Sequence, residues 1–359
     1  MLLNELRLKN LRNIATQDLE LAPGFNLFVG PNGAGKTSLL EGAYLLSHAQ
    51  SFRAGQHDTL IRRDADDMAL YARIERQAGP IQIGLARRDG GWEARVNNDR
   101  VANLGSMLHE FALVCFEPGS HELISGGSEL RRRFLDWSVF HVEPEFLARA
   151  RQYRRALRQR NALLKRAAGD SELDLWDAEL FRAAEPLAAM RRSYFLRYAQ
   201  ELRAVLAVYL PELGETELKL APGWPDELGL DEALRQTHDR DRARGHTTRG
   251  PHRADWSIRF AAAPLREHLS RGQEKLCALA CVLAQAKLYA ATRGEWPVIA
   301  LDDLASELDA DHQRMVVEML QSSGAQILIS GIDVPECLRR IDAPLRVFHV
   351  EHGAVRTLL

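Results

Sequence analysis

The start of the chain alternates between apolar and polar residues in a way that predicts short strands. The alternation covers residues 2–8 and 17–21, and an uninterrupted apolar run follows over residues 25–29. Period-two alternation indicates a strand with one buried face, whereas a short apolar run indicates a strand buried on both faces. The run leads into a glycine-rich loop, and residues 38–46 beyond the loop are compatible with a helix. We therefore expect the order strand, glycine loop, helix.

The middle of the chain changes from strand patterns to helix patterns. Residues 68–101 predict antiparallel strands with a hairpin turn at Gly90-Gly91. Apolar residues then recur every three or four positions over 145–166 and again over 176–209. Joined by the short segment 167–171, these two runs predict an antiparallel helical arm. Arg191 falls on the apolar stripe, which argues against a strict coiled-coil seam.

The last third of the chain returns to short strands and helices after a break rich in proline and glycine at residues 211–230. The pattern predicts a helix from Gln273, a final hairpin around Gly353, and strands over 255–260, 298–301 and 326–330. We expect an α/β fold with a mixed sheet. The head should comprise residues 1–115 and 255–359, with a helical arm and connecting segments inserted as residues 116–254.

Composition is typical of a globular protein of one large or two modest domains. The 359 residues are 46% hydrophobic and 27% charged, with a net charge of -2, so any nucleic-acid site must come from local clustering of cations. The first residues contain no apolar run of signal-peptide length, and other apolar runs are far below the roughly 20 residues that a membrane span needs. We expect a cytoplasmic protein. Its four cysteines are too scattered for a disulfide framework.

The glycine loop matches the pattern Gly-x-x-x-x-Gly-Lys-Thr. Its glycines let backbone N–H groups turn toward phosphates, Lys36 reaches the β and γ phosphates, and the Thr37 hydroxyl binds Mg²⁺. The strand before the loop and the helix after it favour this interpretation over a plain glycine turn. The sequence predicts that ATP or a close relative, with Mg²⁺, is bound by Gly30, Pro31, Asn32, Gly33, Ala34, Gly35, Lys36 and Thr37.

Two carboxylates follow the apolar run 298–301 and resemble the Walker B motif of P-loop ATPases. Successive side chains alternate across a strand, so the two acids can have different roles. We expect Asp302 to hold Mg²⁺ through water, and Asp303 to polarise the attacking water, with Lys36 as the other catalytic residue. The competing interpretation is a strand that ends in a solvated pair of aspartates.

A third segment, Leu269-Ser270-Arg271-Gly272-Gln273, resembles the signature of the ATP-binding-cassette ATPases. Arg271 replaces the first of the two glycines in that signature. The resemblance implies that Ser270, Gly272 and Gln273 bind the γ-phosphate of ATP held by the opposite subunit, and hence an ATP-dependent homodimer. Residues 306–309 are similar to the D-loop of the same superfamily.

The switch histidine of that superfamily is not apparent in this sequence. Either Ser330 or Ile332 occupies the place where the histidine is expected, after the strand 326–330. We therefore expect slow hydrolysis of ATP.

Longer segments resemble the RecF family of bacterial recombination proteins. Residues 116–136 are similar to one family signature, residues 246–255 to a second, and residues 8–13 also fit. Gly119-Ser120 and Ala254 depart from these signatures. The resemblance implies a cytoplasmic ATPase with a cassette head and a helical arm. It also implies DNA binding and cooperation with RecO and RecR to promote RecA loading at gaps, in repair, replication restart and SOS induction.

The arm is locally basic, which fits contact with DNA phosphates. Residues 131–166 contain eleven Lys and Arg against three Asp and Glu, and residues 235–253 contain six Arg against two Asp. A solvated helical face is the alternative, and Arg131, Arg132 and Arg133 could instead anchor the arm to the head. The preference among single-stranded, duplex and gapped DNA stays open.

Three other classes of protein carry some of these motifs. The ATPase subunit of a transporter needs an apolar groove for its membrane partner, whereas this insert is rich in arginine. A P-loop kinase for small molecules has no use for a signature that acts in trans. Tethers of the SMC type need far longer arms than 359 residues allow.

Overall fold

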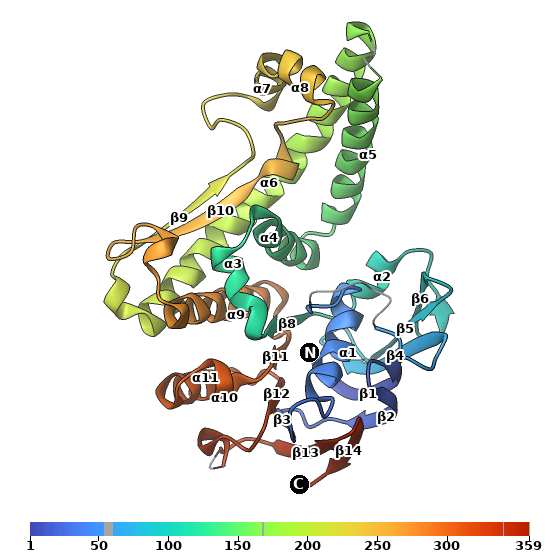
Figure 1. Cartoon of the computed structure of the whole chain (residues 1–359), viewed down its shortest axis with the longest axis vertical. Helices are drawn as coiled ribbons and strands as arrows, with labels where there is room; N and C mark the ends of the chain where they lie inside the picture. The colour runs from blue at the N-terminus through green and yellow to red at the C-terminus, as the bar shows by residue number, and fades with distance from the viewer. Residues whose placement is uncertain (54–59, 167–168, 340, 359) are drawn as a thin grey trace. The chain divides into compact units, whose positions relative to one another are not determined.

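The computed structural model describes residues 1–53, 60–166, 169–339 and 341–358. The chain divides into two compact units, of which the first comprises Met1–His121 and Arg271–Leu359 and the second comprises Glu122–Ser270. The first unit is built of sheets and helices, and the second is dominated by long helices (Figure 1). The second unit is therefore an insertion within the sequence of the first, as the helical arm was predicted to be.

A largely parallel sheet forms the centre of the first unit. Its strands are β3 (Phe25–Val29), β8 (Leu113–Phe116), β11 (Val298–Leu301), β12 (Ile327–Gly331), β13 (Leu345–Glu351) and β14 (Ala354–Thr357). They lie in the order β14-β13-β3-β12-β11-β8, and β14 alone among them runs antiparallel to its neighbour. Every residue of β3, β11 and β12 is buried, because helices cover parallel sheets on both faces. The carboxyl ends of these three adjacent strands meet at one edge.

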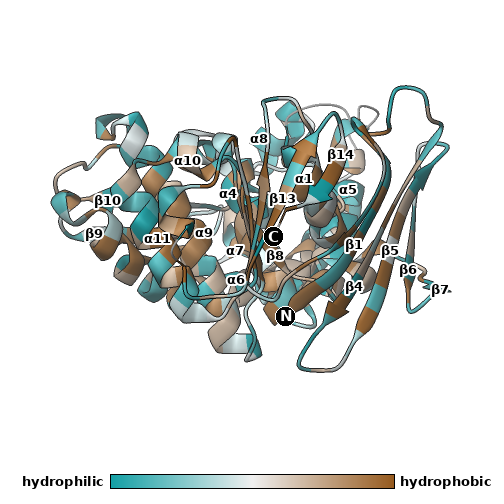
Figure 2. Ribbon diagram, turned by 90° about the horizontal axis from the view of Figure 1, so that it is seen from below, coloured by the Kyte–Doolittle hydropathy of each residue, from teal (hydrophilic) through white to brown (hydrophobic). Residues whose placement is uncertain are grey.

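A second sheet of the same unit is antiparallel. Its strands are β1 (Leu2–Leu11), β2 (Ile14–Glu20), β4 (Asp67–Glu75), β5 (Ile81–Arg88), β6 (Gly91–Val96) and β7 (Asp99–Arg100). They lie in the order β2-β1-β4-β5-β6-β7. Along β4 and β5 every second residue is buried, which Figure 2 shows as alternating hydrophobic and hydrophilic segments. The alternating pattern of the sequence thus becomes a sheet with one face on the core.

Helix α1 (Lys36–His48) lies between the two sheets. It contacts β1, β4 and β5 on one side and β8 and β12 on the other. Gly42 permits this close approach, because a Cβ at that position would lie 2.4 Å from a methyl carbon of Leu8. The other helices of this unit are α2 (Leu104–Leu108), α9 (Arg271–Arg293), α10 (Leu304–Glu307) and α11 (Ala310–Ser323).

Helix α9 is the one helix among the described residues whose length and hydropathy would allow it to cross a membrane. A core helix of a folded domain passes the same test, and 72% of the apolar window of α9 is buried. Cys277 and Cys281 lie on this buried side, where free cysteines pack as small apolar residues.

The second unit is organised around two long helices that pack along each other (Figure 1). Its helices are α3 (Glu122–Ser125), α4 (Ser128–Val142), α5 (Phe146–Lys165), α6 (Asp170–Tyr209), α7 (Leu230–Gln236) and α8 (His238–Arg244). A two-stranded antiparallel ribbon, β9 (Thr216–Ala221) with β10 (Asp255–Phe260), packs against α6 and α4. The antiparallel helical pair predicted from the sequence is confirmed.

A buried ion-pair network ties α5, α6 and α8 together. The Arg160 side chain has no exposed surface; its guanidinium lies 2.5 Å from Asp177 and 2.7 Å from Asp241. It also donates a hydrogen bond of 2.9 Å to the Thr247 hydroxyl. A fully buried cation is tolerated only when it is paired and hydrogen-bonded in this way.

Three of the differences between the predicted and the observed elements concern the arm. Helix α6 begins at Asp170 rather than at residue 176, and residues 167–168 of the predicted connection lie outside the described part. The segment 211–230, which we expected to be a break, contains β9. The predicted boundary at 254/255 differs from the division at 270/271, because β10 pairs with β9 inside the second unit rather than with a strand of the head.

Candidate nucleotide site

The glycine loop connects the carboxyl end of β3 to the first residue of α1. Gly30 has a φ of 155°, and a Cβ there would lie 2.1 Å from the carbonyl oxygen of Val350. Gly35 has a φ of 117°, and a Cβ there would lie 3.0 Å from the side-chain nitrogen of Asn13. Both positions therefore require glycine. The resulting turn presents backbone N–H groups and the N-terminus of α1 to the same space, which suits an anion.

The predicted loop residues occupy two levels. Pro31, Asn32 and Gly33 form the exposed tip, whereas Ala34 and Gly35 are buried at its base. A tip open to solvent over a rigid base lets a ligand approach the backbone N–H groups.

The Lys36 side chain is buried and folds back over the loop. Its ammonium group donates to the carbonyl oxygens of Gly30 at 2.8 Å and Pro31 at 2.9 Å. These two carbonyls hold a positive charge inside the curve of the loop, where phosphates would be drawn to it.

The end of β11 brings Asp302 to the start of α1, and Asp303 follows it in the chain. The Thr37 hydroxyl donates to Oδ1 of Asp302 at 3.0 Å, so the two residues predicted to hold the metal are in contact. Asp302 is buried, while Asp303 is half-buried and has a left-handed φ of 56° at the start of α10. That turn separates the two carboxylates, as different roles for them would require.

Burial governs the protonation of Asp302. Loss of solvent raises the pKa of its carboxyl group above the ordinary value, and hydrogen bonds from Ser330 and Thr37 oppose that rise. A cation placed beside the carboxylate would favour its charged form in the same way.

The two candidates for the switch-histidine position have different surroundings. Ser330 is buried at the end of β12; its hydroxyl donates to Oδ1 of Asp302 at 2.5 Å and accepts the backbone N–H of Asp303 at 2.9 Å. The Ile332 side chain is 51% exposed, and its carbonyl oxygen accepts the N–H of Gly30 at 3.2 Å. Of the two, Ser330 is the residue whose side chain reaches the acids.

A polar cluster behind the loop was not predicted from the sequence. The carboxylate of Glu41 on α1 has no exposed surface and accepts two hydrogen bonds from Arg12, at 2.9 and 2.7 Å. The Ser51 hydroxyl also donates to Glu41 and accepts the backbone N–H of Arg53. The sequence does contain a sign of this cluster, because Glu41 is a charged residue at a core-facing position four residues after Thr37.

The turn between β1 and β2 also supports the loop directly. The Asn13 side-chain nitrogen donates to the carbonyl oxygen of Ala34 at 3.2 Å, and that oxygen also accepts the N–H of Gly353 at 2.8 Å. Asn13, in the segment 8–13 that we noted only for a family resemblance, is thus part of the wall of the site.

The predicted signature residues lie at the start of α9. Ser270, Arg271 and Gly272 are exposed, and Gln273 is half-buried. Arg271 and Gly272 form the first turn of the helix, so the N-terminus of α9 is open to solvent. An exposed helix N-terminus attracts anions.

An ion pair links α9 to the predicted D-loop. The ammonium nitrogen of Lys275 lies 2.9 Å from a carboxylate oxygen of Glu307, the last residue of α10. Asp309 then caps α11 by accepting the backbone N–H of His312 at 3.0 Å. The segment after Asp303 is therefore held at both of its ends.

The chemistry of these side chains fits a magnesium nucleotide. A hydroxyl and a carboxylate in contact, Thr37 and Asp302, are the oxygen ligands that Mg²⁺ takes in P-loop proteins. Lys36 and the turned backbone of the loop supply the positive potential that phosphates need. The site therefore suits triphosphate and metal together.

The two segments that resemble family signatures meet inside the second unit. Arg131 makes a bidentate pair with Asp255, with nitrogen to oxygen distances of 2.7 and 3.0 Å. Arg191 makes a similar pair with Asp136 and donates to the carbonyl oxygen of Pro251. Arg131 thus joins α4 to β10 within the arm, and Arg191 is a buried structural cation rather than a gap in the apolar stripe.

The sheet order, the glycine loop and the acids at the end of β11 define the head of an ATP-binding-cassette type of P-loop ATPase. The family model "RecF/RecN/SMC N terminal domain" matches residues 2–356. The chain is 47% identical over 361 aligned residues to the DNA replication and repair protein RecF of Stenotrophomonas maltophilia, and covers 99% of both chains. It is 49% identical to the RecF protein of Xanthomonas oryzae pv. oryzae, with 98% of each covered. The chain belongs to the RecF family.

Solved structures are similar over the whole chain. The recombination mediator protein RecF with ATP, of the RecFOR pathway, matches with a TM-score of 0.91 and 26% identity, covering 99% of this chain and 97% of that one. A head domain of Smc bound to the C-winged helix domain of ScpA matches with a TM-score of 0.59 and 15% identity, covering 100% and 97% of the two chains. The second likeness concerns the fold alone.

Proposed function

We propose that this chain is an ATP-dependent DNA-binding protein of recombinational repair. In this proposal ATP induces a homodimer that acts at gapped DNA with RecO and RecR to promote RecA loading, and also serves replication restart and SOS induction. The protein works in the cytoplasm without a membrane partner. The observation that carries the proposal is the contact between Thr37 and Asp302 beneath the glycine loop, in a chain that matches RecF relatives from end to end.

The geometry supports a defined role for each residue toward ATP. Lys36 would exchange the carbonyls of its own loop for β- and γ-phosphate oxygens, while the loop N–H groups bind the remaining phosphate oxygens. Thr37 and Asp302 would hold Mg²⁺, which neutralises phosphate charge when bound. Asp303, which follows Asp302 in a left-handed turn, would orient and polarise the attacking water.

The exposed signature supports a site completed in trans. Ser270, Gly272 and Gln273 would meet the γ-phosphate on a second copy of the chain, because an open helix N-terminus favours an anion. The reaction would be a weak, DNA-stimulated ATP hydrolysis that resets the dimer. Ser330 in place of a histidine supports slow turnover, since a serine hydroxyl cannot change charge at neutral pH as an imidazole can.

The proposal is tested by sedimentation with and without ATP and a gapped duplex, which reports dimerisation and DNA binding together. Lys36→Ala should abolish ATP binding and hence both responses. Ser270→Arg should leave ATP bound but prevent the dimer, because the added cation would occupy the place of the partner's γ-phosphate. Normal ATP-dependent dimerisation of the Ser270→Arg variant would contradict the completion of the site in trans.

The ATPase subunit of a transporter remains the alternative function. It predicts an ATP-dependent dimer that does not bind DNA, so the gapped duplex in the same experiment separates the two. The end-to-end match to RecF relatives favours the repair function.

A further inference from the structure

One face of α5 carries a row of exposed cations. Measured from Arg151, the cations lie three, four, seven and fourteen residues further on, which places them on one side of a helix of 3.6 residues per turn. All of them are exposed. We call this row the basic face; it consists of Arg151, Arg154, Arg155, Arg158 and Lys165.

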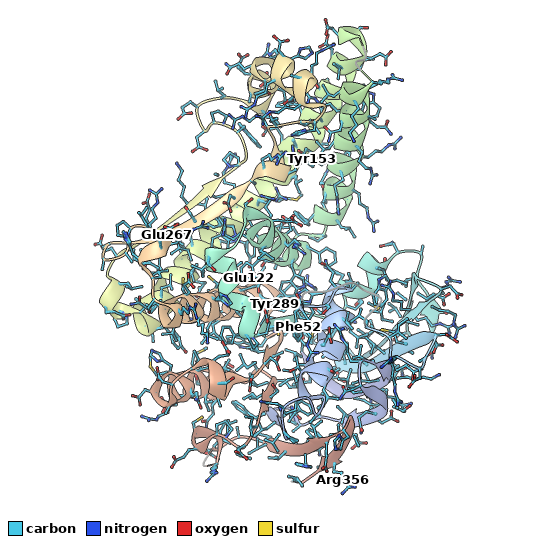
Figure 3. All side chains as sticks on the ribbon, in the orientation of Figure 1. Phe52, Glu122, Tyr153, Glu267, Tyr289 and Arg356 are labelled. Carbon is cyan, nitrogen blue, oxygen red and sulfur yellow. The ribbon has the colours of Figure 1, made fainter. Side chains whose placement is uncertain are left out.

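The opposite side of α5 fixes the direction in which the basic face points. Arg160 lies about half a turn from Arg151 on the helix and is buried in its ion pairs with α6 and α8. Tyr153 and Ala156 are also buried, and the Tyr153 hydroxyl lies 2.6 Å from Nδ1 of His252. Figure 3 labels Tyr153 on α5. The helix cannot turn its cations inward without breaking these contacts.

Acidic side chains around the basic face already pair with other arginines. Glu145 pairs with Arg149, which lies on another side of α5, at 2.8 Å. At the far end of α5, Glu172 forms an ion pair with Arg166. On α6, Glu179 pairs with Arg182 at 3.3 Å. These three acids therefore have arginine partners that lie outside the basic face.

We infer that the basic face of α5 is where the arm binds the phosphate backbone of DNA; this assignment rests on the proposed function and locates its DNA contact. From Arg151 to Lys165 the row extends about 21 Å at a helical rise of about 1.5 Å per residue, enough to follow several phosphates of one strand. Arginine forks bind phosphate oxygens in pairs, and contacts of this kind carry no sequence preference. The basic face can therefore bind DNA of any sequence.

The composition of this face favours nucleic acid over an acidic protein. Protein interfaces are anchored by large apolar or aromatic side chains at their centre. Along α5, all of whose residues are described, the exposed positions outside the basic face hold only small or polar residues, namely Ala148, Gln152, Gln159 and Ala162. Phosphates need no apolar anchor.

The test is DNA binding by the full chain with ATP, measured by fluorescence anisotropy of a labelled duplex and a labelled single strand over a range of salt. A variant with Arg151, Arg154, Arg155 and Arg158 all changed to Ala should bind at least tenfold more weakly. Its slope of log K against log salt should fall by about 0.9 for each lost contact on duplex, or about 0.7 on a single strand. The strand type with the larger loss identifies the DNA that this face binds.

Two control variants make the test specific. Changing the same four arginines to Lys keeps the charges and should keep the salt slope. Changing the half-buried Arg149 and the exposed Arg182 to Ala removes two ion-paired arginines and should leave DNA binding unchanged. ATP-dependent dimerisation and the circular dichroism melting curve verify that each variant is folded.

Three outcomes decide the matter. If the wild-type chain binds DNA and the four-alanine variant binds with the same affinity and salt slope, the basic face is not the DNA contact, and an acidic protein would be its remaining partner. Equal losses in the Arg149 and Arg182 control would also overturn the assignment. If the wild-type chain binds no DNA at all, the result contradicts the proposed function itself and not merely the location of the DNA contact.

Discussion

The Ser330 hydroxyl joins the two acids at the end of β11: it donates to Asp302 at 2.5 Å and accepts the backbone N–H of Asp303 at 2.9 Å. One buried side chain on β12 therefore sets both the orientation of the first carboxylate and the left-handed turn that carries the second. Neither contact depends on ionisation of the serine.

The Ser330→Ala variant should therefore lose affinity for nucleotide in the presence of Mg²⁺. Asp302 would lose one of its hydrogen bonds and the N–H of Asp303 would lose its acceptor, at a cost of about 1–3 kcal/mol, so a loss of about tenfold is expected. Fluorescent ADP titrated with Mg²⁺ and with EDTA measures it. Ser330→Thr keeps the hydroxyl and should restore binding, and Ser322→Ala, at an exposed serine on α11, serves as the control. An equal loss in EDTA would show that Ser330 only supports the fold.

Glu41 should contribute to the stability of the head far more than an exposed carboxylate does. Glu41→Leu would leave the half-buried Arg12 without this carboxylate, Arg12→Leu would leave Glu41 buried without its cation, and breaking such a pair typically costs about 3–5 kcal/mol. Urea unfolding of Glu41→Leu, Arg12→Leu and the double variant forms a complete cycle. The double variant should be more stable than either single variant, whereas additive losses would mean that the two side chains do not interact.

The pair between Lys275 and Glu307 should affect hydrolysis rather than binding of ATP. Glu307→Gln removes the charge that holds the end of α10 to α9, while the glycine loop is untouched. We expect a several-fold lower rate of ATP hydrolysis with an unchanged affinity for ATP. Exchange of the two residues, Lys275→Glu with Glu307→Lys, should recover part of the rate. A change in ATP affinity alone would contradict this role.

Acid should weaken the second unit through His252. Burial lowers the pKa of this imidazole to about 4; its Nδ1 lies against the Tyr153 hydroxyl, and its Nε2 lies 3.0 Å from the carbonyl oxygen of Thr247. In the unfolded chain the His252 imidazole therefore becomes protonated near pH 6.5, whereas in the folded chain it stays neutral down to about pH 4. This stability is present in full above pH 6.5 and is lost as the pH falls through that window.

The measurement is urea unfolding at about pH 7.5 and about pH 5. Linkage gives a loss of about 2 kcal/mol from His252 over this range. His252→Asn cannot take up the proton, so it should be less stable at the higher pH but should lose less stability on acidification. Parallel pH profiles for the two proteins would refute the assignment to His252.

Local patterns predicted most elements because each depends on neighbouring residues. The apolar run 25–29 and the helical spacing of residues 145–166 correspond to β3 and α5 almost without change. β9 was missed because its alternate residues are only half-buried, so that the pattern of Thr216–Ala221 is weak between prolines and glycines. Its pairing with β10, which moves the unit boundary to residue 270, is a contact across the chain that no local pattern contains.

The candidate site likewise combines residues that a local motif predicts with residues that only the fold brings together. The glycine loop, Thr37 and Asp302 were predictable because their chemistry fixes a motif. Ser330 was expected only as one of two candidates for the switch-histidine position, and Glu41 was not predicted, because the contacts that each residue makes are not contained in any local pattern. Their roles follow from the order β3-β12-β11 and from the packing of α1, which place them beside the motif residues.

The position of the insertion has a consequence for how the gene could be modified. β8 and β11 are parallel neighbours, and the chain leaves the end of β8, passes through residues 122–270 and returns through α9 to β11. Strand, helix and adjacent parallel strand form an ordinary crossover even without the inserted residues. Replacing residues 122–270 by a short linker should therefore yield a soluble minimal head, and other inserts could be exchanged at the same junction.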